Sequence, residues 1–224
     1  NERLVETAAS AMRDLPFYHG FNGKSHPASI ELAEKLLQIS PVPMSKVFFA
    51  NSGSEANDTA IKLVWYVNNA LGRPQKKKII SRQKAYHGVT VAAASLTGLP
   101  NNQRDFDIPI DGILYTDCPH YYRYGEAGES EEDFAARCAE NLENLILAEG
   151  PETIAAFFAE PVMGAGGVLV PERRAMAWHQ GEGASGPDPD EQRSQVEQRH
   201  KLSHLIAEKG FRRSVAGRTF PVPL

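Results

Sequence analysis

The sequence predicts an α/β fold in which a mainly parallel sheet is flanked by helices. Short apolar runs that read as strands alternate with longer segments whose apolar residues recur every three or four positions. Each run is joined to the next helix by a short polar turn, which is typical of βα units and a parallel sheet. We assign this fold to residues 1–171. Residues 172–224 read as a poorly ordered C-terminal tail, disordered or weakly helical.

The composition is that of a soluble globular protein, with 224 residues of which 42% are hydrophobic and 23% charged. No apolar run approaches the roughly 20 residues that a membrane helix needs, and no charged-then-apolar leader opens the chain. The formal charge of −4 argues against a general nucleic-acid binder. Cys118 and Cys138 have no metal-binding or redox spacing, so a cytoplasmic location is expected.

Two helices are predicted first, over residues 1–14 and 28–39, because each keeps its apolar residues on one side. Ser40-Pro41 ends the second helix. Residues 15–27 between them form an aromatic, glycine-bearing loop. Its Phe17, Tyr18 and Phe21 read as cover for the edge of a core, and the family resemblance described below implies instead a place at the entrance of a site.

The stretch from Lys46 to Val67 predicts a strand, a turn and a helix. Residues 47–49 read as a buried strand, and Ser52 or Ser54 can cap the helix that follows. An apolar face is predicted at four helical positions, Ala56, Ala60, Leu63 and Val67. The turn is small and polar, so its free N–H groups offer an anion site. An ordinary, well-capped turn is the simpler reading of the spacing alone.

Three further strands and two helices follow. The strands are predicted at residues 79–80, 113–115 and 154–159, the last as a central strand buried on both faces. A helix of small residues follows Gly88, and a longer one begins at Ser130, where an acid three residues later suggests a capping box. Glu160 ends the last strand at its carboxyl edge, where open α/β sheets bind ligands. A glycine-rich segment, 164–167, comes next.

Four local motifs then appear in a fixed order: NSGSEAND, YHG, AEPV and GAGGVLVP. Together they resemble the class III aminotransferases, fold-type I enzymes that use pyridoxal 5'-phosphate (PLP). The similarity runs from Asn1 to about Pro171. Smaller details, KIISR, SLTGLP and FFAEPVMGAGG, resemble the ω-amino-acid:pyruvate branch. This resemblance implies a partial PLP-binding domain over residues 1–171 and a divergent tail over 172–224.

The resemblance also implies roles for seven residues. The amides of Ser52, Gly53 and Ser54 would cradle the cofactor phosphate, and Tyr86 would stack on the pyridine ring. His87 would be mainly structural, and Gly88 would let the backbone come close to the ring. Glu160 would lie near the cofactor, either with a direct part in catalysis or hydrogen-bonded to loop amides. The implied reaction transfers an amino group from an ω-amino acid or amine to a keto acid such as pyruvate, in a homodimer.

Two family features have no match. The family forms a Schiff base through a lysine and places an aspartate beside the pyridine nitrogen. Asp188 lies between two prolines and Asp190 follows the second, and Lys201 and Lys209 lie in a charged segment, so neither role is assigned. We therefore expect no catalytic residue and no turnover by this chain alone. The alternatives are a lysine-less paralogue that binds a phosphate ligand or pairs with a full-length subunit, and another fold-type I activity, such as an aminomutase or decarboxylase.

Overall fold

The computed structural model of the chain describes residues 1–171. Predictions about the tail lie outside the described residues, including those on Asp188, Asp190, Lys201 and Lys209. The described chain contains two compact units, Asn1–Phe49 and a second one that begins at Ala50. The boundary that the sequence suggests at Pro171 stays a prediction.

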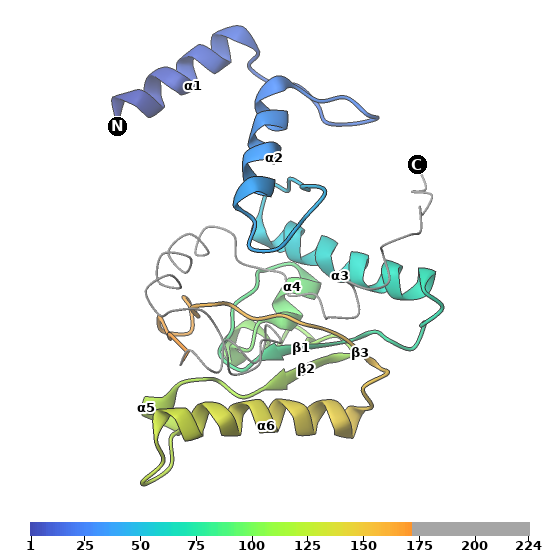
Figure 1. The fold of residues 1–224 in the computed structure, drawn as a ribbon, viewed down its shortest axis with the longest axis vertical. Coiled ribbons are helices and arrows are strands. Elements are labelled where there is room, and N and C mark those ends of the chain that lie inside the picture. The colour runs from blue at the N-terminus through green and yellow to red at the C-terminus, as the bar shows by residue number, and fades with distance from the viewer. Residues whose placement is uncertain (172–224) are drawn as a thin grey trace. The chain divides into compact units, whose positions relative to one another are not determined.

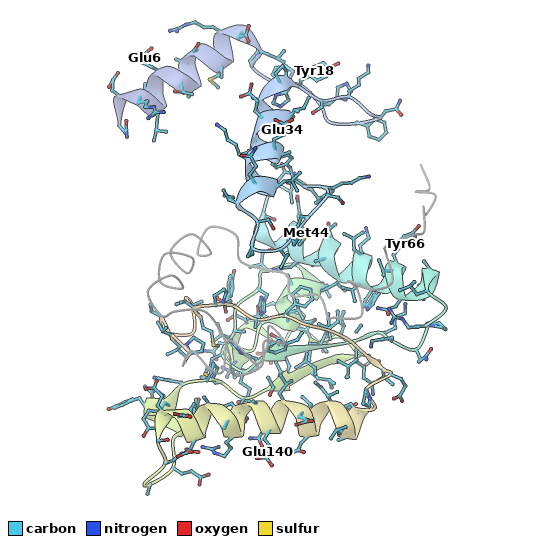
Figure 2. The ribbon with its side chains drawn as sticks, in the orientation of Figure 1. Glu6, Tyr18, Glu34, Met44, Tyr66 and Glu140 are labelled. Carbon is cyan, nitrogen blue, oxygen red and sulfur yellow. The ribbon has the colours of Figure 1, made fainter. Side chains whose placement is uncertain are left out.

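The first unit contains α1 (Glu2–Asp14) and α2 (Pro27–Ile39), which confirms both predicted helices. The Asn1 side chain caps α1 by accepting the N–H of Arg3 at 3.1 Å. Neither helix has a buried residue, and their side chains stand out from the ribbon in Figure 2. Phe17 and Phe21 are 87% and 78% exposed, so they cover no core in this unit.

The predicted strand over residues 47–49 is wrong. These residues have no regular secondary structure, and Phe48 is 68% exposed. A strand is stable only when a neighbour accepts and donates its backbone hydrogen bonds. Within the described residues no backbone hydrogen bond joins 47–49 to another segment, so an apolar sequence was not sufficient to make a strand.

The second unit is built on a parallel sheet of β1 (Lys78–Arg82), β2 (Ile113–Thr116) and β3 (Ile154–Phe157). Their order is β2-β1-β3, and both pairings are parallel, as predicted. The prediction that β3 is central and buried on both faces is wrong for the described sheet. β1 holds the middle, with Ile79 and Ile80 fully buried, whereas alternate residues of β3 are only half-buried.

Helices cover both faces of this sheet (Figure 1). On one side lie α3 (Gly53–Ala70) and α4 (Val91–Leu96), and on the other lies α6 (Glu131–Glu149). The short helices η1 (Pro100–Asn102) and α5 (Tyr121–Tyr124) lie in the connections. The main core joins the sheet to α3 and α4 through Ile61, Ile79, Leu96, Ile113, Ala156 and Phe158. No helix among residues 1–171 is long and apolar enough to cross a membrane.

The buried face of α3 differs from the predicted one. The structure buries Ser54, Asn57, Ile61 and Asn68, whereas the predicted Leu63 is 53% exposed. Two asparagines are tolerated inside because each amide donates to a backbone carbonyl: Asn57 to His87 and Asn68 to Val64. Hydrogen bonding, rather than apolarity alone, sets which side of α3 faces the sheet.

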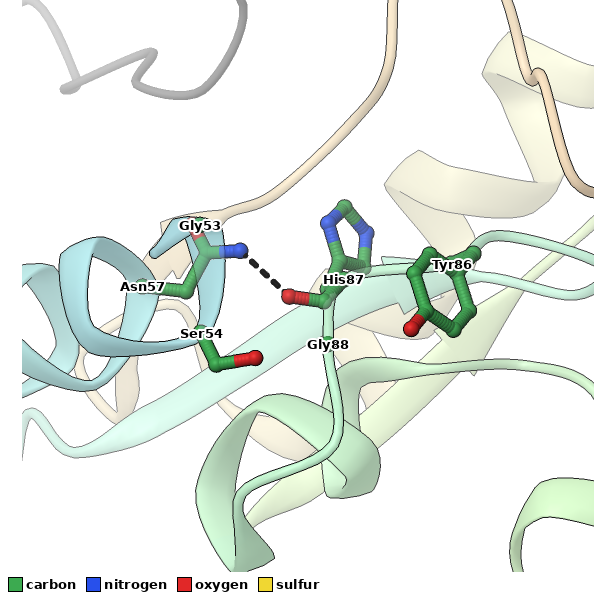
Figure 3. Close-up of a pocket in the computed structure, with 6 residues that line it drawn as sticks. All are labelled: Gly53, Ser54, Asn57, Tyr86, His87 and Gly88. Atoms are coloured by element: carbon green, nitrogen blue, oxygen red, sulfur yellow. Dashed lines mark hydrogen bonds between the residues drawn. The ribbon is translucent and has the colours of Figure 1, made fainter. Parts of the chain in front are cut away.

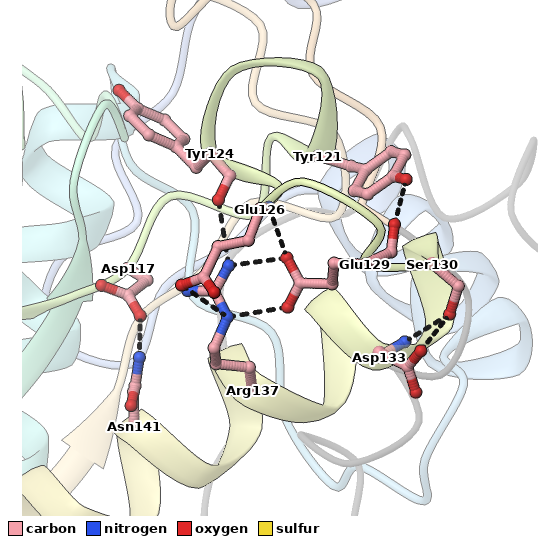
Figure 4. Close-up of polar contacts among 9 residues, drawn as sticks. All are labelled: Asp117, Tyr121, Tyr124, Glu126, Glu129, Ser130, Asp133, Arg137 and Asn141. Carbon is pink, nitrogen blue, oxygen red and sulfur yellow. Dashed lines mark hydrogen bonds and ion pairs between the residues drawn. The ribbon is translucent and has the colours of Figure 1, made fainter.

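A polar cluster fastens the start of α6 (Figure 4). The Ser130 side chain accepts the N–H of Asp133, so the predicted cap is confirmed. Arg137 donates two hydrogen bonds of 2.8 Å to Glu129 and one of 3.0 Å to the Tyr124 carbonyl. This bidentate pair holds the loop before α6 against the helix. Glu140, by contrast, lies on the outer face of α6, away from the sheet (Figure 2).

Candidate functional site

A cavity of about 220 Å³ lies where the N-terminus of α3 meets the loop after β1. Figure 3 shows the six residues that line it: Gly53, Ser54, Asn57, Tyr86, His87 and Gly88. Five of these are predicted site residues. They come from two segments some thirty positions apart, which the parallel sheet brings together at the carboxyl end of β1.

The N-terminus of α3 presents unused backbone donors to this cavity. Ser52 is the N-cap, and its side chain accepts the N–H of Glu55 at 3.1 Å. The Glu55 carboxylate turns back to accept the N–H of Asn51 at 2.9 Å. Among the described residues the N–H groups of Gly53 and Ser54 have no acceptor. Free N–H groups at the positive end of an 18-residue helix favour an anion.

The loop that carries Tyr86, His87 and Gly88 is fastened to α3 by side chains of the helix. The Ser54 hydroxyl accepts the N–H of Val89 at 3.1 Å, and the Asn57 amide donates to the His87 carbonyl at 2.7 Å (Figure 3). Asp58 continues the series by accepting the Thr90 hydroxyl at 2.8 Å and the Ala93 N–H at 3.1 Å. These contacts fix the distance between the helix and the loop.

Gly88 has to be a glycine for packing and for backbone conformation. Its φ is +139°, in the region that favours glycine. A Cβ at this position would clash with the Ser54 hydroxyl and lie 2.8 Å from the Ala93 Cβ. The sequence prediction gave Gly88 a role against a ligand ring. The structure adds that Gly88 allows α3 and α4 to meet.

Glu160 anchors Tyr86. Its Oε1 accepts the backbone N–H of Tyr86 at 2.9 Å, and its Oε2 accepts the N–H of Gly164 at 3.3 Å. Of the two roles left open for this residue, this geometry corresponds to a carboxylate hydrogen-bonded to loop amides. Burial raises the pKa of Glu160, and the two N–H donors and Arg82 oppose that rise.

Arg82 supports the same junction from the end of β1. Its guanidinium is 2% exposed, donates to the Glu160 carbonyl at 3.2 Å and lies 5.4 Å from the centre of the Phe157 ring. Burial lowers the pKa of Arg82 to about 10, so the group stays charged at neutral pH. Its Nη2 has no hydrogen-bond partner among residues 1–171.

His87 is buried at 3% exposed and packs edge-on against Phe158, with ring centres 6.3 Å apart. Its backbone N–H donates to the Thr97 hydroxyl at 2.9 Å, and its backbone carbonyl accepts from the Asn57 amide. The main chain of His87 is therefore held on both sides. This agrees with the structural role that the resemblance implies.

The structure brings all seven predicted residues to one region. Five line the cavity, Ser52 caps α3 and Glu160 binds the Tyr86 backbone. The sequence reasoning missed Asn57, Asp58, Arg82 and Thr97. A signal for Asn57 was available, because residues 54, 57, 61 and 68 recur at helical spacing and define a buried face that includes polar side chains.

Comparison with known proteins identifies the family. The class-III aminotransferase family pattern matches residues 1–179. Gamma aminobutyrate transaminase 1 of Solanum lycopersicum is 61% identical over 170 residues, which are 75% of this chain and 33% of that protein. Vanillin aminotransferase of Capsicum chinense is 59% identical over 170 residues, 75% of this chain and 37% of that protein. This chain thus spans about a third of these relatives.

Solved structures of aminotransferases also align with this chain. The omega transaminase from Pseudomonas jessenii in complex with PMP aligns with a TM-score of 0.77 and 65% identity, over 80% of this chain and 39% of that one. The PMP-bound aminotransferase from Vibrio fluvialis aligns with a TM-score of 0.76 and 48% identity, over the same shares of the two chains. Class III aminotransferases use PLP as their cofactor. The chain belongs to the class-III aminotransferase family.

Proposed function

We propose that this chain supplies the phosphate-binding and ring-binding part of a PLP-dependent transaminase. The reaction transfers an amino group from an ω-amino acid or amine to a keto acid such as pyruvate. When bound, PLP supplies the electron-withdrawing ring that carries the amino group between the two substrates. The observation that carries the proposal is the pair of unused N–H groups, on Gly53 and Ser54, in the cavity that Tyr86 also lines.

The residues present fit the phosphate of this cofactor. Among the residues that the structure describes, no carboxylate lines the cavity, and the one acid in the first turn of α3, Glu55, is turned toward Asn51. Among the described residues, no atom lies within 4 Å of the position that a Cβ on Gly53 would take, so the backbone at Gly53 is open to a ligand. A dianion placed here would receive charge-assisted hydrogen bonds and the favourable end of the helix dipole.

The residues also fit an aromatic ring. Tyr86 is half-buried and lines the cavity, and its backbone is held by Glu160. A flat, polarisable side chain can stack on a ring and leave the opposite face of that ring open to substrate, provided that its backbone is held in place. Tyr86 would therefore orient the cofactor, while His87 would support the loop from inside.

The donor class follows from the relatives' names. One is a gamma aminobutyrate transaminase, another a vanillin aminotransferase and several structural neighbours are omega transaminases. Gamma-aminobutyrate carries its amine on the terminal carbon, so it is an ω-amino acid. We propose the same class here, with a homodimer as the working assembly and the cytoplasm as its location.

We propose further that these 224 residues bind PLP without catalysing the reaction. Lys201 and Lys209 lie in a charged sequence unlike that around the family's Schiff-base lysine. The second candidate is a non-catalytic paralogue that pairs with a complete aminotransferase. Co-purification with a complete aminotransferase would favour that candidate, and pyruvate-dependent transamination by the purified chain would contradict both.

A pair of substitutions at Gly53 tests the phosphate site. Gly53 is the first residue of α3, where proline is tolerated, and Ser52 before it is already extended, as proline requires. Gly53→Pro therefore removes one N–H donor and leaves the helix intact, whereas Gly53→Ala keeps the donor. We expect PLP affinity to fall about tenfold in Gly53→Pro, as for one hydrogen bond to a charged group, and to change little in Gly53→Ala.

The titrations should include pyridoxal, which lacks the phosphate. The proposal requires the unmodified chain to bind PLP more tightly than pyridoxal and requires Gly53→Pro to reduce that preference. Equal affinity of the unmodified chain for the two compounds would contradict the proposed site.

A further inference from the structure

Asn57 is the one residue of the cavity that sequence reasoning did not single out. It is 1% exposed, and its amide donates to the His87 carbonyl at 2.7 Å (Figure 3). Its Oδ1 is buried and has no partner among the described residues. Two features distinguish this side chain from Asn68, the other buried amide of α3: it lines the cavity, and its hydrogen bond reaches another segment of the chain.

Asn57 connects the two halves of the candidate site. It lies one turn into α3, three residues after Ser54, and its hydrogen bond reaches the loop beside Tyr86. Asp58 also contacts this part of the chain, but it bonds to Thr90 and Ala93, farther along, and it does not line the cavity. Among the described residues, Asn57 is the cavity-lining side chain that donates to the 86–88 segment.

We propose that Asn57 is a positioning residue that sets the spacing between the anion-binding turn of α3 and the Tyr86 loop. Its Nδ2 holds the loop through the His87 carbonyl. This inference rests on the proposed function, because it supposes one ligand that uses both halves of the site.

The inference separates two kinds of ligand. Inorganic phosphate needs only the N-terminus of α3, whereas PLP needs that terminus and the Tyr86 loop at a fixed distance. Loss of the Asn57 amide should therefore weaken PLP binding and leave phosphate binding nearly unchanged. A residue that merely stabilised the fold would weaken both ligands together.

Asn68 provides a matched control. It lies in the same helix, is 5% exposed, donates its Nδ2 to the Val64 carbonyl at 2.9 Å and also has an unpartnered Oδ1 among residues 1–171. It lies eleven residues from Asn57, roughly 16 Å along the helix at 1.5 Å per residue. Asn68→Ala should thus impose a similar loss of stability without touching the site.

The experiment measures the dissociation constants of PLP and inorganic phosphate for the full 224-residue chain and for Asn57→Ala and Asn68→Ala. We expect Asn57→Ala to weaken PLP binding about tenfold and phosphate binding less than twofold, and Asn68→Ala to change neither. Asn57→Leu has a similar volume and adds no charge to the cavity but cannot donate to the His87 carbonyl, so it should reproduce the PLP loss.

Each other outcome contradicts a different claim. Failure of the unmodified chain to bind either ligand would contradict the proposed function and this inference with it. Normal binding by the unmodified chain, with equal losses of both ligands in Asn57→Ala, would contradict the inference alone. If Asn57→Ala does not fold, hydrogen exchange in the unmodified chain decides: PLP should slow exchange of the 86–90 amides more than inorganic phosphate does, and equal protection by the two ligands would overturn the inference.

Discussion

The backbone N–H of Tyr86 donates to Oε1 of Glu160 at 2.9 Å, joining two segments that lie 74 residues apart in the sequence. Tyr86 follows β1 and Glu160 follows β3, so this bond ties the carboxyl ends of two neighbouring parallel strands. Arg82 closes the connection by donating to the Glu160 carbonyl at 3.2 Å. The candidate ring-binding residue therefore depends on a carboxylate behind it.

Substitution of Glu160 should show that dependence. Glu160→Ala leaves the N–H groups of Tyr86 and Gly164 without their acceptor, whereas Glu160→Gln keeps one acceptor oxygen. A hydrogen bond to a charged group is worth about 1.5–3 kcal/mol, and its loss would free the backbone of Tyr86. We therefore expect PLP affinity to fall roughly tenfold in Glu160→Ala and less in Glu160→Gln. Titration with PLP measures both. Equal effects of the two variants would contradict an acceptor role.

Gly88→Ala should destabilise the fold strongly. The new Cβ would clash with Ser54, and alanine disfavours a φ of +139°. Backbone strain and overpacking each cost about 1–3 kcal/mol. Gly53→Ala is the control, because its Cβ would meet nothing within 4 Å. Urea unfolding should separate the two variants, and similar midpoints would argue against the tight approach of the loop to α3.

The Glu129–Arg137 pair should make stability depend on pH. Hydrogen bonding to Arg137 is the main cause that lowers the pKa of Glu129 from 4.5 to about 2. Because the folded-state pKa is the lower one, the stabilisation is present above pH 4.5 and is lost as pH falls from there toward 2. Glu129→Gln should therefore be less stable than the unmodified chain at pH 7 and approach it at pH 3. Urea unfolding at each pH checks this. A difference in stability between the two proteins that does not narrow at low pH would contradict a stabilising role of the Glu129–Arg137 pair.

Arg82 offers a test of the buried guanidinium. Arg82→Ala removes its packing against Phe157 and its bond to Glu160, and leaves a cavity. Arg82→Met removes the charge but fills most of the space, and it also removes the cost of burying a cation with an unpartnered Nη2. We expect Arg82→Met to be clearly more stable than Arg82→Ala in thermal unfolding. The reverse order would show that filling this space does not stabilise the junction.

The elements that could be predicted from sequence are those whose signals are local. Ser52 and Ser130 both cap helices as expected, because an N-cap needs only a side chain and the next turn. Parallel pairing also followed from the alternation of strands and helices. Residues 47–49 failed because a strand depends on a partner elsewhere in the chain, which an apolar run does not specify.

Site residues could be predicted where they belong to one continuous motif. They could not be predicted where they depend on contacts between segments far apart in the sequence. Gly53, Ser54 and Tyr86 belong to motifs that can be recognised as written. Asn57 and Arg82 act through the carbonyl groups of His87 and Glu160, and such pairings depend on how α3 is turned and how β1 and β3 align. A period of three or four residues gives a helix, but here it did not specify which side faces the sheet.

The most direct test of the account combines equilibrium dialysis with borohydride reduction of the full chain in the presence of PLP. We predict one equivalent of bound PLP per chain, reduced binding in Gly53→Pro, and no lysine modified in stoichiometric amount when the reduced chain is mapped by mass spectrometry. A single stoichiometric adduct, at Lys201 or Lys209 for example, would contradict the claim that the chain binds its cofactor without a Schiff-base lysine. No bound PLP would contradict the site itself.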